Sequence, residues 1–150
     1  MTKQSLFYKL NVTAKISQIL AIRFFNQNKK ADITFNQYEI LSVLKRSNNY
    51  YQRDLAKFLC KGTANLSKDL KTLEENGLIK RVLETHNNRM VKTIHLTKMG
   101  EKLLEKNVAL IENYVNKFLK IYKNDECKQF EEYLDRLKDT LTESADIIFE

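Results

Sequence analysis

The chain has 150 residues, of which 43% are hydrophobic and 30% are charged, and this composition excludes a disordered protein. No apolar stretch approaches the roughly 18 residues of a membrane span, and residues 1–10 lack the apolar core of a secretion signal. We therefore expect a cytoplasmic protein without a membrane partner. Because the chain has no proline and only three glycines, we also expect long helices.

The positive charge is concentrated in the first two-thirds of the chain. The net charge is +7, to which residues 1–33 contribute +5, residues 34–100 contribute +6 and residues 101–150 contribute −4. A basic part followed by an acidic part suggests that one surface faces a polyanion and another faces something else. Lysines that only maintain solubility would give the same totals, so charge alone leaves both interpretations open.

Two helices are predicted before residue 50. Residues 5–27 place apolar side chains at helical spacing, which predicts an amphipathic helix with a broad apolar stripe. Residues 28–32 break this pattern. Thr34 followed by Gln37 then fits a capping box, so a second helix is expected to begin there and to end at the turn-prone residues 47–49.

A helix-turn-helix is predicted next. Its first helix covers residues 52–60, and its second, over residues 64–76, carries leucines at i, i+4 and i+7 on one face. Gly77 suits the left-handed conformation that ends helices, and two short helices joined by about three residues form this motif. We expect the apolar side chains of both helices to point inward: Leu55, Phe58, Leu59, Leu66, Leu70 and Leu73.

A β-hairpin is predicted over residues 78–97. Strand-forming residues lie at both ends of this segment, and its polar middle contains Asn87 and Asn88, which tolerate the dihedral angles of a tight turn. A hairpin directly after a helix-turn-helix is the wing of a winged helix. Thr97 is placed to cap a further helix that begins at Lys98.

Two long helices are predicted over residues 98–123 and 125–148. Their apolar residues alternate steps of three and four, which is typical of a coiled-coil-like contact. A winged helix needs neither of them, so their apolar faces require another partner. An intertwined homodimer and an intramolecular three-helix bundle with the first helix both meet that need. The predicted dimerisation residues are Leu6, Leu10, Val115, Phe118, Tyr122, Phe130, Leu134, Leu137, Leu141 and Ile148.

The segment from Ile33 to Leu104 resembles the MarR family of bacterial regulators. The matching stretches are ITFNQYEIL, QRDLAKFL, NLSKDLKTLEENGLIKR and NRMVKTIHLTKMGEKLL, in the order and spacing of that family. The resemblance implies a mainly α protein with a small β-hairpin wing, forming a single domain over residues 1–150. The winged helix would span about 34–100, with dimerisation helices over 1–33 and 101–150. It also implies a dimer that binds a two-fold symmetric operator, in most cases as a repressor that small ligands or oxidants release.

The sequence departs from the family pattern at three places. The wing tip has Asn88 before Arg89 where the family usually has aspartate, which puts the orientation of the arginine in doubt. Tyr51 occupies a capping position that is commonly serine or threonine, which removes a side-chain acceptor. Residues 61–63 are Lys-Gly-Thr without the acidic residue of the family, and this removes a repulsion against phosphate.

Predicted DNA contacts lie on the outward face of the recognition helix and on the wing. Asn65 can read adenine, Lys68 can bind guanine or phosphate, and Arg89 can enter a narrow minor groove. The alternatives are a solvated charge for Lys68 and Arg89, and helix capping for Thr63 and Asn65. The predicted contacts to double-stranded DNA are Gln52, Arg53, Lys61, Thr63, Ala64, Asn65, Ser67, Lys68, Lys71, Thr72, Asn88 and Arg89.

Other kinds of site have weaker support in the sequence. Cys60 and Cys127 form no metal-binding pattern, and for Cys60 a buried packing role is favoured over a redox role, whereas Cys127 is a weak redox candidate. Aromatic residues of the first helix and of residues 104–122 can line an effector pocket or belong to the core. We expect no metal, no cofactor and no catalytic group. A winged helix that binds another protein and no operator is the rival class.

Overall fold

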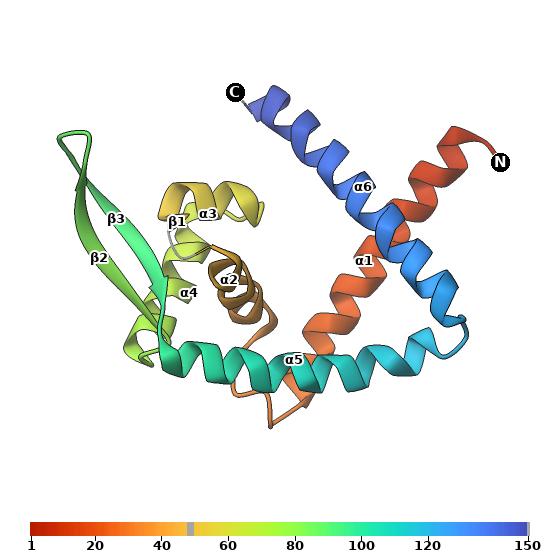
Figure 1. Cartoon of the computed structure of the whole chain (residues 1–150), viewed down its shortest axis with the longest axis horizontal. Helices are drawn as coiled ribbons and strands as arrows, with labels where there is room; N and C mark the ends of the chain where they lie inside the picture. Colours follow the sequence, from red (N-terminus) through yellow and green to blue (C-terminus); the bar gives the residue numbers. More distant parts are fainter. Residues whose placement is uncertain (48–49, 150) are drawn as a thin grey trace. The chain divides into compact units, whose positions relative to one another are not determined.

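The computed structural model describes the backbone of residues 1–47 and 50–149, and within these ranges the side chains as far as residue 144. The chain divides into two compact units, residues 1–110 and residues 111–150. Figure 1 labels the elements along the chain. They are α1 (Lys3–Gln27), α2 (Phe35–Arg46), β1 (Tyr50–Tyr51), α3 (Gln52–Phe58), α4 (Thr63–Glu75), β2 (Ile79–His86), β3 (Arg89–Leu96), α5 (Lys98–Leu119) and α6 (Asn124–Phe149).

The core of the first unit is formed by apolar side chains from α2, α3, α4 and the sheet. The fully buried ones come from each of these elements, so the helix-turn-helix, α2 and the hairpin share one core. They are Ile40, Leu41, Leu44, Leu55, Leu66, Leu70, Leu73, Ile79 and Ile94. This mainly helical architecture with a hairpin wing is the fold that the sequence predicts, and the fold class is confirmed.

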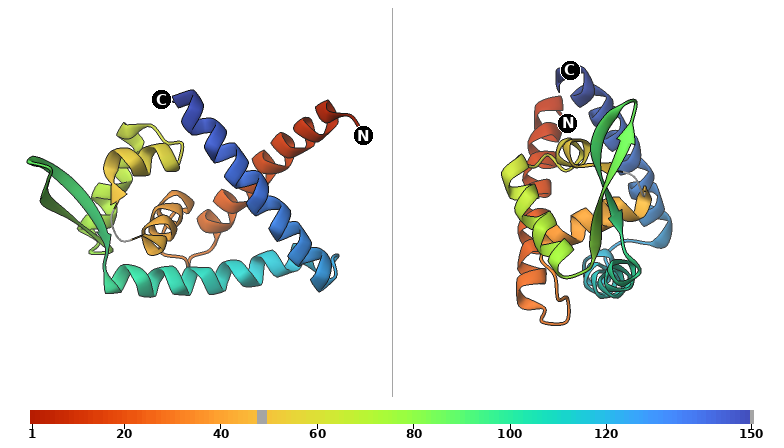
Figure 2. Two further views of the ribbon diagram at one scale, coloured as in Figure 1. Left: turned by 45° about the horizontal axis from the view of Figure 1, so that its top comes forward. Right: turned by 90° about the vertical axis from the view of Figure 1, so that its left-hand side faces the viewer.

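The wing is a two-stranded hairpin extended at its base by a short third strand. The sheet order is β1-β3-β2, all antiparallel, and the register runs from Ile79 opposite Leu96 to His86 opposite Arg89. Asn87 and Asn88 form the tight turn with φ values of 49° and 60°, which confirms the predicted turn. Figure 2 shows the hairpin extending away from the helices of the first unit.

Local capping fixes the ends of several helices, as the sequence predicts. Thr34 accepts from the amide of Gln37 at 3.2 Å, and the Gln37 side chain accepts from the amide of Thr34 at 3.1 Å, so the capping box is complete. Thr97 accepts from the amide of Gly100 at 3.1 Å. A Cβ at Gly100 would lie 2.1 Å from the carbonyl oxygen of Leu78, so only glycine permits this approach of α5 to the wing base.

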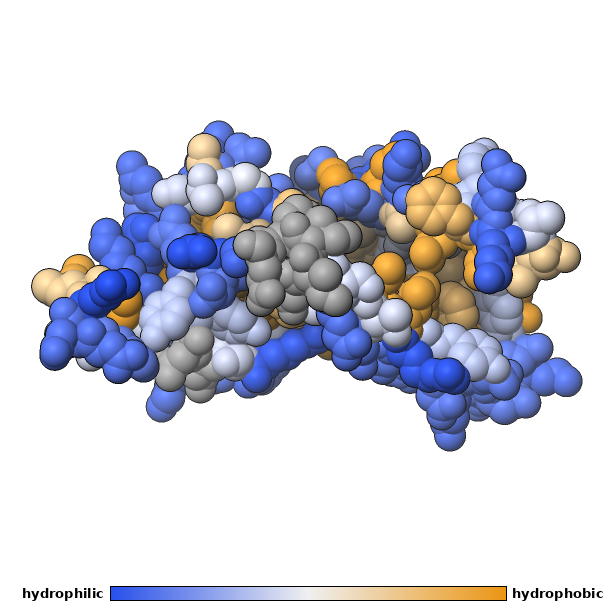
Figure 3. All heavy atoms as spheres, turned by 90° about the horizontal axis from the view of Figure 1, so that it is seen from above, coloured by the Kyte–Doolittle hydropathy of each residue, from blue (hydrophilic) through white to orange (hydrophobic). Residues whose placement is uncertain are grey.

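The long helices leave much of their apolar surface open in the single chain. In α1 only Phe25 is buried, and no described side chain of α6 is buried. Hydrophobic side chains are visible at the surface in Figure 3. Among the described residues, no helix is both long and apolar enough to cross a membrane.

The end of α5 differs from the prediction. The helix was expected to reach residue 123, but it ends at Leu119, and Tyr122 lies in the turn before α6. The amide of Tyr122 donates to the carbonyl of Leu119 at 2.9 Å, which closes this turn. Steps of three and four continue through Tyr122 in the sequence, so spacing alone places the end of the helix too late.

Candidate nucleic-acid interface

The recognition helix α4 has one apolar and one polar face, as its sequence predicts. Leu66, Leu70 and Leu73 are fully buried and hold the helix on the core. On the opposite side, small and polar residues face solvent, which would permit close approach to base edges in a major groove. The exposed residues of this face are Thr63, Ala64, Asn65, Ser67, Lys68 and Lys71, while Thr72 is half-buried.

The turn between α3 and α4 ends α3 earlier than expected. The Lys61 amide donates to the carbonyl of Ala56 at 3.0 Å, and Cys60 adopts a left-handed conformation with φ 50°. The side chain of Cys60 is exposed, so the expectation that it packs in the interior is wrong. Phe58, also expected to point inward, is 53% exposed, because the helix stops there and its last turn faces solvent.

Lys61, one of the predicted DNA contacts, is held by other residues of the chain. Its ammonium lies 3.0 Å from a carboxylate oxygen of Glu39 and donates to the side-chain oxygen of Asn36 at 2.9 Å. Only 15% of its side chain is exposed. Lys61 therefore ties the turn to α2, and a phosphate would have to compete with Glu39 for it.

Several other predicted contacts carry a charge without an ion pair in the described part of the chain. The exposed residues Arg53, Lys68 and Arg89 have no ion-pair partner there. Lys71 lies 3.8 Å from Glu75, but 72% of its side chain is exposed, so this contact is loose. These cations on α3, α4 and the wing tip are thus largely free to attract a polyanion.

A charged contact attaches the end of the recognition helix to the wing. In β2, Arg81 donates from Nε to a carboxylate oxygen of Glu74 at 2.8 Å, and its backbone amide donates to the other oxygen at 3.2 Å. The Arg81 hydrogen bond holds the pKa of Glu74 below its ordinary value. The spacing of seven residues across a glycine turn belongs to no helix or strand pattern, and the sequence analysis did not find this pair.

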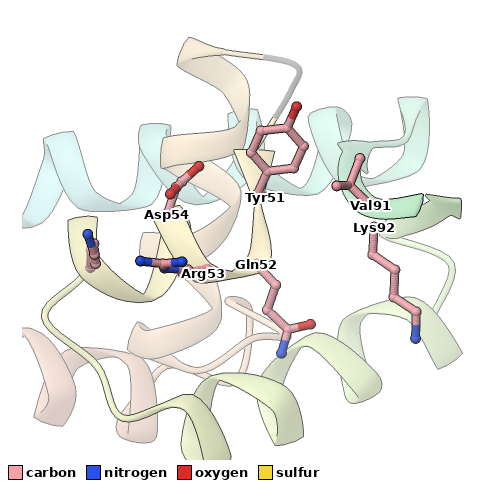
Figure 4. Close-up of a pocket in the computed structure, with 7 residues that line it drawn as sticks. Tyr51, Gln52, Arg53, Asp54, Val91 and Lys92 are labelled. Atoms are coloured by element: carbon pink, nitrogen blue, oxygen red, sulfur yellow. The ribbon is translucent and has the colours of Figure 1, made fainter. Parts of the chain in front are cut away.

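A hollow opens beside these elements, between the start of α3 and the wing strand β3. Figure 4 shows Gln52 and Lys92 pointing toward α4, which is drawn below them. Gln52 and Arg53 were predicted to contact DNA, whereas the sequence analysis did not single out Lys57 or Lys92 as contacts. The seven residues that line the hollow are Tyr51, Gln52, Arg53, Asp54, Lys57, Val91 and Lys92.

The remaining predicted residues fall into two groups. Asn88 and Arg89 are exposed at the wing tip, as predicted, and Cys127 is half-buried near the start of α6. No group of three potential metal ligands occurs among the described residues. Contact of any of these residues with DNA, and redox activity of either cysteine, stay predictions.

The comparison with family models finds a match to part of the chain. The model described as the MarR family matches residues 33–91, which contain α2, the helix-turn-helix and most of the wing. This segment is therefore similar to the MarR family. No match was found among the curated proteins.

Solved structures with a similar fold match nearly the whole chain. The chain is similar to a MarR family protein from Bacillus stearothermophilus, with 20% identity and a TM-score of 0.73 over 95% of this chain and 99% of the other. The transcriptional regulator BldR from Sulfolobus solfataricus is 23% identical, with a TM-score of 0.76 over 95% and 99%. MepR from S. aureus, solved in complex with DNA, is 25% identical, with a TM-score of 0.63 over 93% and 96%. These likenesses extend beyond the matched domain and include the flanking helices.

The predicted dimerisation residues lie outside the matched segment 33–91, on α1, α5 and α6 and, for Tyr122, in the turn between α5 and α6. Leu10 is half-buried, and Ile148 lies outside the residues whose side chains are described. All the others are exposed in the single chain: Leu6, Val115, Phe118, Tyr122, Phe130, Leu134, Leu137 and Leu141. Exposed side chains of this size and spacing are unfavourable in water without a partner.

Proposed function

We propose that the protein is a sequence-specific transcriptional regulator that binds a pseudo-palindromic operator as a homodimer and acts as a repressor. The observation that carries this proposal is the exposed polar face of α4, with Lys68 on it and Arg89 at the tip of the wing. Neither cation has an ion-pair partner among the described residues. A helix with such a face can enter a major groove while the wing reaches the adjacent minor groove.

The homodimer is supported by the apolar faces of the long helices. Phe130, Leu134, Leu137 and Leu141 recur on one face of α6 and are all at least 37% exposed. A second copy would bury such a face, and a two-fold axis would also present two recognition helices to successive turns of the duplex. Release by a small ligand or an oxidant is part of the proposal through the family resemblance alone.

Salt-dependent DNA binding tests the proposal. The DNA upstream of the protein's own gene is titrated with the protein at several salt concentrations, and the affinity is measured by fluorescence anisotropy. We expect a steep linear fall of log affinity with log salt, because each phosphate contact releases counterions. Binding absent even at low salt would favour the alternative, a winged helix that contacts another protein.

Two substitutions locate the contacts. Arg89→Ala should weaken DNA binding while leaving the dimer intact, and Lys68→Ala should change either the sequence preference or the salt dependence. Lys102→Gln, an exposed lysine of α5, serves as the control. Unchanged affinity in both variants would remove the wing and α4 from the interface.

A further inference from the structure

We propose that the hollow between α3 and β3 is a binding site for one backbone phosphate of double-stranded DNA, which Arg53, Lys57 and Lys92 would hold. This inference rests on the proposed function and adds Lys57 and Lys92 to the interface. The three cations come from two elements that are distant in sequence, and they line the same hollow. Such a site would bind one phosphate of the DNA strand and would not distinguish between base sequences.

The charge of the hollow is positive and unneutralised. Arg53, Lys57 and Lys92 are all exposed, and within the described ranges none of them has an ion-pair partner. Asp54 is the one acidic residue of the lining. In Figure 4 its carboxylate points in the direction opposite to the ends of Gln52 and Lys92. An anion that enters from the side of α4 would therefore meet Lys92 and the Gln52 amide before it meets the acid.

The hollow is built by the pairing of β1 with β3. Tyr51 pairs with Thr93 in the sheet, and α3 begins at the next residue, so Gln52 and Arg53 are held beside Val91 and Lys92. The ring of Tyr51 also packs edge-on against His86 of the wing, with ring centroids 6.5 Å apart. The spacing between the cations of α3 and Lys92 thus depends on strand pairing within one unit.

The position of the hollow matches the path of a DNA strand. A protein that places α4 in a major groove and the wing tip in the neighbouring minor groove must straddle the sugar-phosphate backbone that separates them. The hollow lies between the helix-turn-helix and the wing strand, and Lys92 is close enough to α4 to act electrostatically on Glu74. The strand between the two grooves would therefore pass the three cations.

Salt dependence provides the first test. Lys57→Gln and Lys92→Gln are each compared with the full-length protein and with Lys102→Gln, and all variants are checked by circular dichroism and thermal unfolding. We expect the slope of log affinity against log salt to become shallower for each variant of the hollow, by up to about 1.8 because the dimer carries each substitution twice, and the affinity to fall by up to roughly sixtyfold near 0.1 M salt. The loss should be equal for operator and unrelated DNA, because a phosphate contact carries no sequence information.

Lys92→Arg separates a charge contact from a folding defect. Its charge is retained, so we expect the slope of the unchanged protein. One outcome is a steep fall of DNA affinity with salt for the unchanged protein, while both glutamine variants have the same slope as Lys102→Gln. In that case the hollow does not bind a DNA phosphate, and the proposed function stands. If no protein form binds DNA, the proposed function itself fails.

Neutral DNA backbones provide the second test. Methylphosphonate linkages are introduced one at a time along the strand between the grooves of the bound DNA. At one linkage, Lys92→Gln should lose less affinity than the unchanged protein, because the substitution has already removed part of the same contact. Additive losses at every linkage would overturn the proposal. The alternative ligand is a free phosphate ion, and it is tested by titrating the protein with inorganic phosphate and following the binding by NMR. If phosphate binds tightly, and if Lys92→Gln abolishes this binding without changing the salt dependence of DNA affinity, the hollow binds a free anion and the proposal is wrong.

Discussion

The winged helix over residues 34–100 and the terminal helices α1 and α6 differ in how far they bury their apolar side chains. The winged helix buries leucines from α2, α3 and α4 completely within one chain. In contrast, α6 buries none of its described side chains, although it repeats apolar residues on one face. The first region has a core within a single copy, whereas the second has an apolar face that is open in the single chain and that the proposed dimer would cover.

Charge follows this division at the C-terminal end alone. The cations of the winged helix include several without an acidic partner among the described residues, and residues 1–33 are also basic, with a net charge of +5, whereas the last fifty residues carry a net charge of −4. The proposed DNA-binding surface and the acidic C-terminal part would therefore not compete for the same polyanion. Mutations in the two regions should therefore have separable effects, one on stability or DNA binding and the other on association.

The largest effect on stability is expected from Leu70→Ala. This leucine of α4 is fully buried, and its truncation should lower the free energy of unfolding by about 2–5 kcal/mol through lost burial and a cavity. Urea denaturation at several protein concentrations measures the loss and separates it from association. A loss below about 1 kcal/mol would contradict the view that the winged helix is stabilised by a core within a single chain.

The next effect concerns association and uses Leu137→Lys. Leu137 lies on the open face of α6, where a lysine would cost the single chain little but would place a charge in the proposed interface. We expect the dimer dissociation constant, measured by analytical ultracentrifugation, to rise about a hundredfold or more. Glu132→Gln makes the same change in charge and should have little effect. An unchanged dissociation constant for Leu137→Lys would remove α6 from the interface.

The features that could be predicted from the sequence are local. The capping box of Thr34 and Gln37, the turn at Asn87 and Asn88, and the cap at Thr97 each involve residues no more than three positions apart. The buried leucines of α4 follow from helical periodicity. Such patterns determine the elements and their inward faces before any tertiary contact is known.

The features that were missed depend on contacts between elements. Lys61 reaches Glu39 across 22 positions, and Lys92 meets α3 only because β1 pairs with β3. The exposed Cys60 results from the early end of α3, where a residue other than glycine takes the left-handed conformation. Residue type indicated burial for this cysteine, but the backbone conformation decided the outcome.

A smaller effect, within the winged helix, is expected from Glu74→Gln. Because Arg81 holds the pKa of Glu74 below its ordinary value, the carboxylate stabilises the fold fully at neutral pH. That stabilisation is fully present above the unfolded pKa of Glu74 and is lost as the pH falls through its lower folded pKa, where the folded form also takes up the proton. The substitution should cost about 0.5–1 kcal/mol at pH 7, since the pair is partly screened by solvent.

Stability curves against pH test this pair. The difference between the unchanged protein and Glu74→Gln should be greatest at neutral pH and should vanish in acid, once the carboxyl group is protonated in the folded form as well. Glu75→Gln is the control, because Glu75 lies 3.8 Å from Lys71 in a loose surface contact. A difference that is independent of pH would show that the glutamine acts through packing and not through the charge on Glu74.

The smallest effect is expected from Cys60→Gly, at the turn that leads into α4. A left-handed conformation at φ 50° costs a residue with a Cβ roughly 1 kcal/mol, which glycine avoids, although glycine also gains freedom in the unfolded chain. We therefore expect a net stabilisation of about 0.5 kcal/mol and no change in the dimer dissociation constant. Cys60→Ala removes the same thiol but keeps the Cβ, so it should give no such gain. If alanine stabilises the protein as much as glycine does, loss of the exposed thiol is the cause, and the backbone at this turn is not strained.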